Sequence, residues 1–352
     1  MSGVADEDLA SFWTPPAPRE LPAVRSALAE HMRSPYQLEL SARVLAAGKG
    51  ALVPAGAPRQ AAATLLADEG QRLRAADLYY VAEEMSELAR VAGESLPRFT
   101  LDVEDLPSPG GFIQFASSIG SYVSDEDGGL PRRIHIVACS WGRTTLRTGH
   151  EGVWVTFWCP TNRSGLVERF VREDGLRRTD AERIVRAMGA ELTWDNEAFL
   201  PFGTDGLALV DRNRRVAGGG LGATGRSTTP WIQSLRAGWL LISQQGIADV
   251  ERQRLSRQQQ RRAVREGCPF GDVQVVRLRG RSGPGKSAGA DDSGYSVRWM
   301  VRGHWRHQAY GAQRGLRRPV WVKPHLKGPS DAPLSIREKV LLIDRPNPRE
   351  SQ

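Results

Sequence analysis

Cysteine is scarce in this sequence. The 352 residues include only three, Cys139, Cys159 and Cys268, and they are widely and irregularly spaced. This count excludes a disulfide framework and the paired CxxC ligands of a structural zinc site. The three side chains are therefore expected to be buried free thiols.

Long apolar runs and a basic N-terminus are also missing. The most apolar run, Trp239 to Ile242, is far shorter than the roughly 20 residues that a membrane-spanning helix needs. Residues 1–10 carry three acidic side chains and no basic one, the reverse of a secretory leader. The sequence thus predicts a cytoplasmic protein without a membrane segment.

Positive charge is concentrated in one part of the chain. Residues 251–330 hold 18 Lys and Arg against 5 Asp and Glu, whereas residues 1–250 hold 26 against 31. A concentrated basic field favours polyanions, of which nucleic acid is the commonest in a cell. The hydrophobic content of 40% is sufficient for a folded core, so this is not a disordered basic chain.

Hydrophobic periodicity and turn residues predict an α+β fold. In the first 75 residues, Pro22 to about Met32 and the Ala-rich stretch 59–76 are typical of helices. Residues 77–160 predict a helix ended by Gly93 and several strands arranged as in an antiparallel sheet. These strands are expected at 78–81, 99–103, 112–115, 134–139 and 153–158.

The second half predicts more helices and a smaller sheet. Short helices are expected at 164–174 and 180–188, the second opened by a capping box of Thr179 and Glu182. An amphipathic helix begins near Pro230, and a polar, basic helix is expected over 248–266. Strands should follow at 273–279, 295–304 and 320–323, and 340–343 is a further candidate.

The order of these elements predicts two domains. A helical N-terminal segment (1–75) precedes an α+β domain (76–211). A Gly- and Arg-rich linker (212–226) then leads to a basic α+β domain (227–346) and a short tail (347–352). The basic domain is expected to be a helix packed on an antiparallel sheet.

Two glycine-rich stretches match nucleotide-binding patterns without the required context. Gly220 to Gly225 satisfies GxGxxG, but it follows charged residues where a buried strand is needed. Gly280 to Ser287 satisfies the P-loop pattern, but the residues after it are a poor start for a phosphate-binding helix. We interpret them as a linker and a hairpin loop and expect no cofactor.

The strongest functional pattern is a run of cations with interleaved aromatic residues. If residues 295–304 form one strand, Arg298 and Arg302 share a basic face that continues into Arg306. Cations that hold phosphates beside rings that stack on bases are typical of nucleic-acid-binding surfaces. The candidate binding residues are Arg298, Arg302, Trp305, Arg306, Tyr310, Arg317, Arg318, Lys323 and Lys327.

Other interpretations fit the same segment. His304 and His325 could act as acid and base in metal-independent cleavage of RNA, with nearby cations stabilising the charged phosphorane. The basic face could instead bind an acidic protein, as an adaptor does. No metal site is expected, because His304 and His307 would lie on opposite faces of a continuing strand.

A separate DNA-binding interpretation concerns the short helices at 164–174 and 180–188. They could form a helix-turn-helix with Arg183 and Arg186 facing DNA. Simple packing of two short helices on a core explains the same pattern.

Two stretches of the sequence are similar to a known group of proteins. They are Val297–Arg306, which contains Arg-Gly-His-Trp-Arg, and Arg318–Pro329, which contains Pro-Val-Trp-Val-Lys-Pro-His. Both stretches resemble proteins encoded by actinobacteria and by their phages and mobile elements. The turn Leu106–Phe112 is similar to the central region of that group, and the resemblance covers about residues 75–345. It implies a bacterial or phage setting and a two-part layout. The group has no established activity, so the resemblance carries over no catalytic residue.

Overall fold

The computed structural model describes residues 9–48, 53–124, 132–172, 175–188, 190–205, 228–265, 272–279 and 299–327. The contacts of the chain define two compact units. The sheet unit comprises residues 1–279 and 305–321, and the small unit comprises residues 280–304 and 322–352. Arg298, Cys268, the segment 212–226 and the glycine motifs at 220–225 and 280–287 lie outside the described residues.

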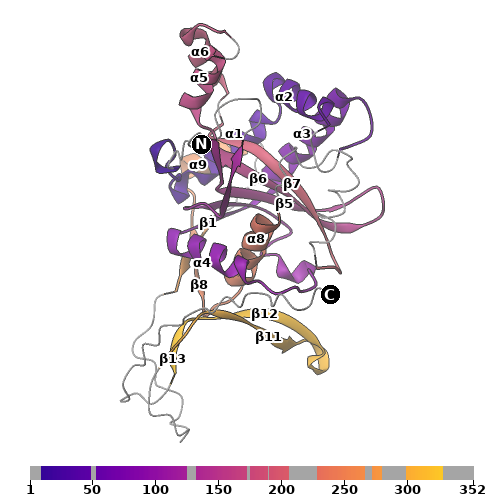
Figure 1. Ribbon diagram of the computed structural model, residues 1–352, viewed down its shortest axis with the longest axis vertical. Coiled ribbons are helices and arrows are strands. Elements are labelled where there is room, and N and C mark those ends of the chain that lie inside the picture. Colours follow the sequence, from indigo (N-terminus) through magenta and orange to yellow (C-terminus); the bar gives the residue numbers. More distant parts are fainter. Residues whose placement is uncertain are drawn as a thin grey trace, which may run out of the picture. The chain divides into compact units, whose positions relative to one another are not determined.

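The fold is α+β, as predicted, and its centre is a seven-stranded mixed sheet (Figure 1). The strand order is β7-β6-β5-β2-β1-β9-β8. The strands are β1 (Asp77–Val81), β2 (Gly110–Phe115), β5 (Ala138–Thr145), β6 (Glu151–Pro160), β7 (Leu192–Pro201), β8 (Ala248–Gln253) and β9 (Val273–Leu278). Two-stranded sheets are formed by β3 (Gly120–Ser124) with β4 (Arg132–Ile136), β11 (His304–Tyr310) with β12 (Leu316–Val322), and β10 (Trp299–Val301) with β13 (His325–Lys327).

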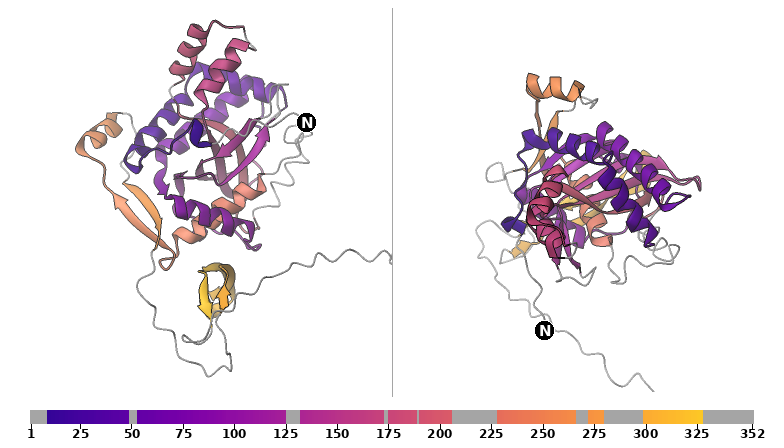
Figure 2. Two further views of the ribbon diagram at one scale, coloured as in Figure 1. Left: turned by 60° about the vertical axis from the view of Figure 1, so that its left-hand side comes forward. Right: turned by 90° about the horizontal axis from the view of Figure 1, so that it is seen from above.

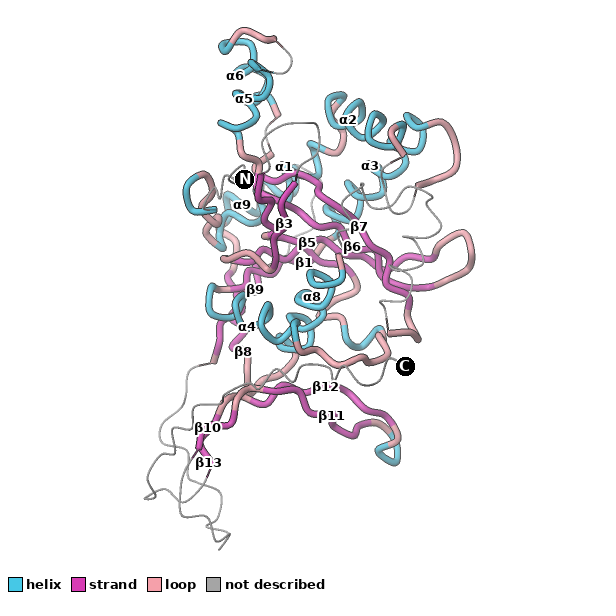
Figure 3. Tube along the Cα trace, viewed as in Figure 1, coloured by secondary structure: helices cyan, strands magenta, loops and turns pink. Residues whose placement is uncertain are grey.

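Helices cover both faces of the large sheet. The described α-helices are α1 (Leu21–His31), α2 (Pro35–Ala46), α3 (Pro58–Ala75), α4 (Glu83–Glu94), α5 (Arg163–Arg172), α6 (Arg178–Ala187), α8 (Thr229–Ile242) and α9 (Arg257–Arg265). Helices α4 and α8 pack side by side on one face, as Figure 3 shows. Helices α1 and α3 pack on the other face, with α2 against α3.

The first face carries the larger core. Ile113 and Phe115 of β2 lie in it with Trp141 of β5, all fully buried. From α8, Leu235 and Trp239 reach the same core, because the apolar residues of that helix recur at helical spacing. This confirms the helix predicted from Pro230 onward, but α8 is not amphipathic as predicted, because residues on nearly all of its sides are buried.

The centre of the sheet is parallel, which the sequence did not predict. Strand β1 pairs in parallel with β2 on one side and with β9 on the other. Helix α4 provides the crossover that a parallel β1–β2 pair requires. Within residues 77–160 the predicted antiparallel pairing holds for β2 with β5, for β5 with β6 and for β3 with β4, and β7 extends the large sheet beyond β6.

Several predicted elements differ from the structure. Residues 99–103 form no strand. Phe99 packs against Leu240 of α8, and Leu101 lies in the main core, where its backbone N–H donates to the Thr204 carbonyl. Helix α6 begins after Arg177, so the capping box of Thr179 and Glu182 is wrong. The predicted helix 248–266 is strand β8 followed by α9, since β8 completes its backbone hydrogen bonds with β9. The predicted strand 295–304 is interrupted after Val301, and a new strand starts at His304.

Gly93 does not end its helix. It lies inside the last turn of α4, which continues to Glu94, and its φ is not in the left-handed region. A methyl group on Gly93 would lie 2.7 Å from the backbone N and Cα of Ser234 in α8. Glycine at this position therefore permits close contact between the two helices, a different role from the predicted cap.

The predicted boundary at 212–226 does not coincide with the compact units. Elements on both sides of that segment, β1 before it and β9 after it, are neighbours in one sheet. Helix α8 likewise packs on α4 and not on a sheet of its own. Among the described residues of the predicted basic domain, only 299–304 and 322–327 belong to the small unit.

Candidate nucleic-acid interface

The β11–β12 hairpin is fixed to the sheet unit by two tryptophans. Trp305 donates its indole N–H to the Ala92 carbonyl of α4 at 2.8 Å. Its ring meets that of Trp321 edge to face, with centroids 5.2 Å apart. The backbone N–H of Trp321 donates to the Gln244 side chain at 3.0 Å. Trp305 is therefore a packing residue, and its ring is not presented for base stacking.

Arg318 and Tyr310 are also engaged within the protein. The Arg318 guanidinium lies 3.0 Å from the Asp105 carboxylate, 3.6 Å from that of Glu104, and 4.7 Å from the centre of the Tyr310 ring. Burial raises the pKa of Asp105, and the positive charges of Arg318 and Arg236 oppose this shift. These two predicted binding residues thus join the hairpin to the protein, so we exclude them from the interface.

The charge cluster beneath the hairpin extends to a fully buried arginine. Arg236 of α8 donates to the carbonyl of Phe99 at 3.0 Å, and its guanidinium lies 4.1 Å from the centre of the Phe99 ring. Burial lowers the pKa of Arg236 to about 10. The cluster gives the hairpin a rigid base, because its members bond to backbone as well as to each other.

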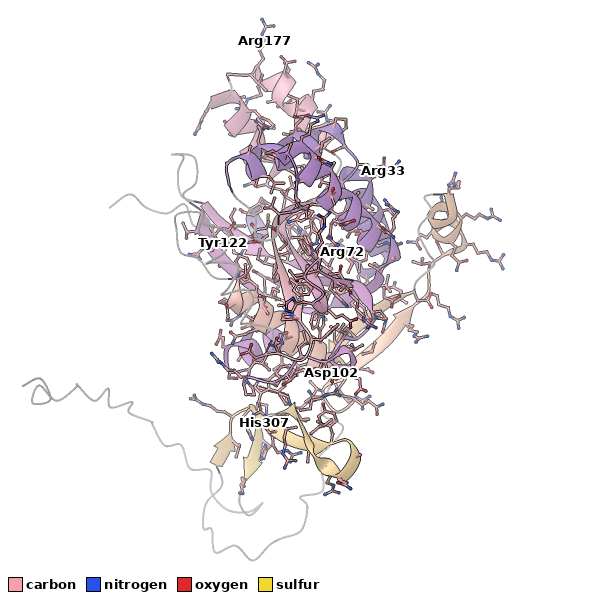
Figure 4. All side chains as sticks on the ribbon, turned by 90° about the vertical axis from the view of Figure 1, so that its right-hand side faces the viewer. Arg33, Arg72, Asp102, Tyr122, Arg177 and His307 are labelled. Carbon is pink, nitrogen blue, oxygen red and sulfur yellow. The ribbon has the colours of Figure 1, made fainter. Side chains whose placement is uncertain are left out.

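The hairpin also carries basic side chains that are exposed. We define the hairpin surface as Arg306, His307, Arg314 and Arg317, all exposed; His307 is labelled in Figure 4. Arg306 bonds to Gln308, and Arg317 to the Arg314 carbonyl. Among the described residues none of the four has an acidic partner. Their charges are therefore available to an anionic ligand.

The remaining predicted residues belong to the small unit. Arg302, His304, His325 and Lys327 are exposed, and Lys323 is half-buried. Strand β10 pairs with β13, so that Val301 lies opposite His325. The Nδ1 atoms of His304 and His325 each bond to the carbonyl two residues earlier, at 3.0 Å. Because a carbonyl oxygen can only accept, each Nδ1 is the donor of its bond.

A second basic surface was not among the predicted site residues. It lies on α9, which joins β8 to β9, and an open hollow there is lined by Arg257, Gln258, Arg261 and Arg265. We call these four residues the α9 face. No ion pair neutralises its arginines among the described residues, and residues 252–265 contain no Asp or Glu. The sequence already indicated this surface, because an arginine occurs at every fourth position from Arg257 to Arg265.

Arginines on the strands next to α9 are neutralised. Arg277 of β9 pairs with Glu251 of β8 at 2.7 Å, and Arg279 lies 3.9 Å from Asp249. Such exposed pairs contribute little stability. They neutralise Arg277 and Arg279, so the arginines of this region that have no acidic partner among the described residues are those of α9 together with Arg252 and Arg254 just before it.

A buried polar network lies on the opposite side of the sheet from α4 and α8. Glu69 of α3 is fully buried and accepts hydrogen bonds from Arg72, from Thr156 at 2.8 Å and from Ser140. The indole N–H of Trp158 donates to Ser140 at 2.9 Å. The carboxylate is satisfied by its neighbours and shielded from solvent, so we interpret this network as a link between helix and sheet.

Helices α5 and α6 have a small core of their own. Val167 and Phe170 of α5 pack against Ala181 and Val185 of α6. This agrees with the packing interpretation of the helix pair, and Arg183 forms an ion pair with Asp180 on the same helix. Of the two predicted DNA contacts, Arg183 and Arg186, only Arg186 is exposed and has no acidic partner among the described residues.

Metal-binding clusters and membrane-spanning helices are both absent from the described residues. Within them, no group of three or more His, Cys, Asp or Glu side chains is placed to hold a metal ion. No described helix has both the length and the apolar composition needed to cross a membrane. Cys139 is fully buried, and burial raises the pKa of its thiol well above the usual value.

Comparisons of this chain with protein-family models, with curated proteins and with solved structures found no match.

Proposed function

We propose that this protein binds nucleic acid, as an accessory or regulatory protein, through the hairpin surface. The observation that carries the proposal is the set of exposed arginines Arg306, Arg314 and Arg317, which have no acidic partner among the described residues. A phosphate backbone supplies the missing negative charge at regular spacing. The anchored base of the hairpin holds these cations in place before binding, which reduces the entropic cost of association.

The cellular setting of this proposal rests on the sequence. The resemblance at Val297–Arg306 and Arg318–Pro329 supports a bacterial, phage or mobile-element origin. Binding to nucleic acid supports a place in the cytoplasm. The small unit has exposed cations of its own, Arg302 and Lys327.

The proposal predicts a change in salt dependence. The triple variant Arg306→Ala, Arg314→Ala, Arg317→Ala should bind duplex DNA, single-stranded DNA or RNA with a shallower slope of log affinity against log salt. Three lost phosphate contacts should reduce the slope by about 2 to 3. Fluorescence anisotropy with labelled oligonucleotides over a salt series measures it.

A matched control removes three arginines of the same exposure that already have acidic partners. Arg33, Arg59 and Arg178 are exposed and pair with Glu30, Glu39 and Glu168. Their triple alanine variant should leave the slope unchanged. Equal effects of the two triple variants would mean that only net charge matters and would overturn the hairpin surface.

A denaturing gel of the same reactions tests the alternatives. Cleavage that stops in the His304→Ala and His325→Ala proteins would assign the small unit a nuclease activity. No binding to any nucleic acid at low salt would overturn the proposed function and favour an acidic protein partner.

A further inference from the structure

The α9 face has the chemistry and the placement of a base-reading surface. Arg257, Arg261 and Arg265 follow one another at four-residue intervals, and Gln258 is next to them. At 3.6 residues per turn these four positions span an arc of about 100° on one side of the helix. They therefore form a single surface, about 12 Å long at 1.5 Å per residue.

The opposite side of α9 is attached to the sheet unit. Leu255, just before the helix, is buried in the core of the second sheet face. Gln259 forms a capping box with Ser256, through bonds of 3.3 and 3.0 Å, and donates its side-chain N–H to the Arg19 carbonyl at 2.7 Å. Gln260 donates to the Leu255 carbonyl at 3.2 Å. Gln259 lies roughly opposite the arginine row around the helix, so its bond to Arg19 holds α9 by the side away from that row.

The helix also stands clear of its surroundings. In both views of Figure 2 and in Figure 4, α9 lies at the margin of the sheet unit, beyond the end of β8. Arg252 and Arg254, which precede it, are exposed as well. A projecting helix flanked by cations can enter a groove while the flanking residues contact the phosphates on its rim.

We infer that α9 reads base edges in the major groove of duplex DNA, an inference that rests on the proposed nucleic-acid binding. The major groove of B-form DNA is about 12 Å wide and admits an α-helix. Arginine bonds in bidentate fashion to guanine O6 and N7, and glutamine to adenine N6 and N7. The α9 face offers both side-chain types together. A surface that held only phosphates would require the arginines but not Gln258.

The test begins with selection. The full-length protein is incubated with a pool of random duplexes of about 20 base pairs, and bound molecules are amplified over several rounds. An enriched motif that contains guanine and adenine is expected. The Arg261→Lys and Gln258→Ala proteins should then bind the selected duplex about 5- to 150-fold more weakly, the loss expected for one bidentate contact. Both should bind a scrambled duplex as the unaltered protein does.

Control variants of the same type lie off the α9 face. Gln260→Ala, outside the arc of the α9 face, and Arg277→Lys, in the ion pair with Glu251, should leave affinity for the selected duplex unchanged. Arg261→Lys keeps the charge, so its effect separates base recognition from phosphate attraction.

The outcomes distinguish the two proposals. If the protein binds duplexes but enriches no motif, or if the α9 variants lose affinity equally for every sequence, the base-reading role is overturned and the hairpin surface stands. Selective binding to single strands or RNA would also overturn it. If no nucleic acid binds at low salt, the proposed function fails, and the inference about α9 fails with it.

Discussion

The Glu69→Ala protein should lose about 3–5 kcal/mol of its free energy of unfolding, the usual cost of removing one partner from a buried ion pair. The side chain of Glu69 is fully buried, and that of Arg72 is 15% exposed. Removing the carboxylate leaves the Arg72 guanidinium without its counter-charge. It also leaves the hydroxyls of Ser140 and Thr156 without their acceptor. Equilibrium unfolding in urea, followed by circular dichroism, measures the loss.

The chain contains a matched pair for comparison. Glu87 and Arg90 of α4 have the same three-residue spacing, but their side chains are 54% and 36% exposed. Because solvent screens such a pair, Glu87→Ala should change the free energy of unfolding by no more than about 0.5 kcal/mol. Replacing both Glu69 and Arg72 by leucine should recover part of the loss, since no unpaired charge is left. Similar losses in the two single variants would contradict the buried-network interpretation.

Elements with a local apolar periodicity were predictable from the sequence. Helix α8 places Trp231, Leu235 and Trp239 on one side at helical spacing, and the structure buries all three. Helix α3 shows the same periodicity, with Leu65, Glu69 and Leu73 at four-residue intervals. That spacing already places Glu69 on the buried side, so a carboxylate on an apolar helix face was the available signal for the network.

Pairing between distant segments could not be predicted in this way. Strand β8 exposes Asp249, Glu251 and Arg252 and buries only Ala248, so its residues show no alternation. Its extended conformation comes from hydrogen bonds with β9, which in turn lies beside β1, almost 200 residues away. A sequence pattern within β8 contains none of this information, and its arginines favoured a helix.

The interface was predicted by composition and partly misassigned by register. The excess of cations near the C-terminus is visible from the sequence, and Arg306 and Arg317 are exposed as predicted. To predict whether Trp305 and Arg318 contact a ligand, one must know which way each side chain points. That depends on the course of strands β11 and β12: the predicted strand 295–304 ends at Val301, and β11 begins as a separate strand at His304. Contacts with Ala92 and Asp105, about 200 residues earlier, then fix both side chains.

The Gly93→Ala protein should be destabilised by about 1–3 kcal/mol, although alanine is the better helix former. The added methyl group would lie 2.7 Å from backbone atoms of Ser234 and 3.0 Å from the carbonyl carbon of Gln233. Backbone in the middle of α8 cannot move aside as the end of a flexible side chain can. Helices α4 and α8 must therefore separate, which loosens the core that they cover on the first sheet face.

A glycine-to-alanine substitution in the other helix of this interface should stabilise the protein. Gly238 of α8 also faces α4, but a methyl group there would meet Ala89 at 3.8 Å and Phe115 at 3.9 Å, ordinary contact distances. Gly238→Ala should therefore raise the free energy of unfolding by up to about 1 kcal/mol, because alanine loses less conformational freedom on folding. Urea unfolding of the two variants side by side tests the geometry. If the Gly93→Ala protein were as stable as the Gly238→Ala protein, α4 and α8 could not approach each other as closely as described. Close packing of the two helices would then not explain the glycine at position 93.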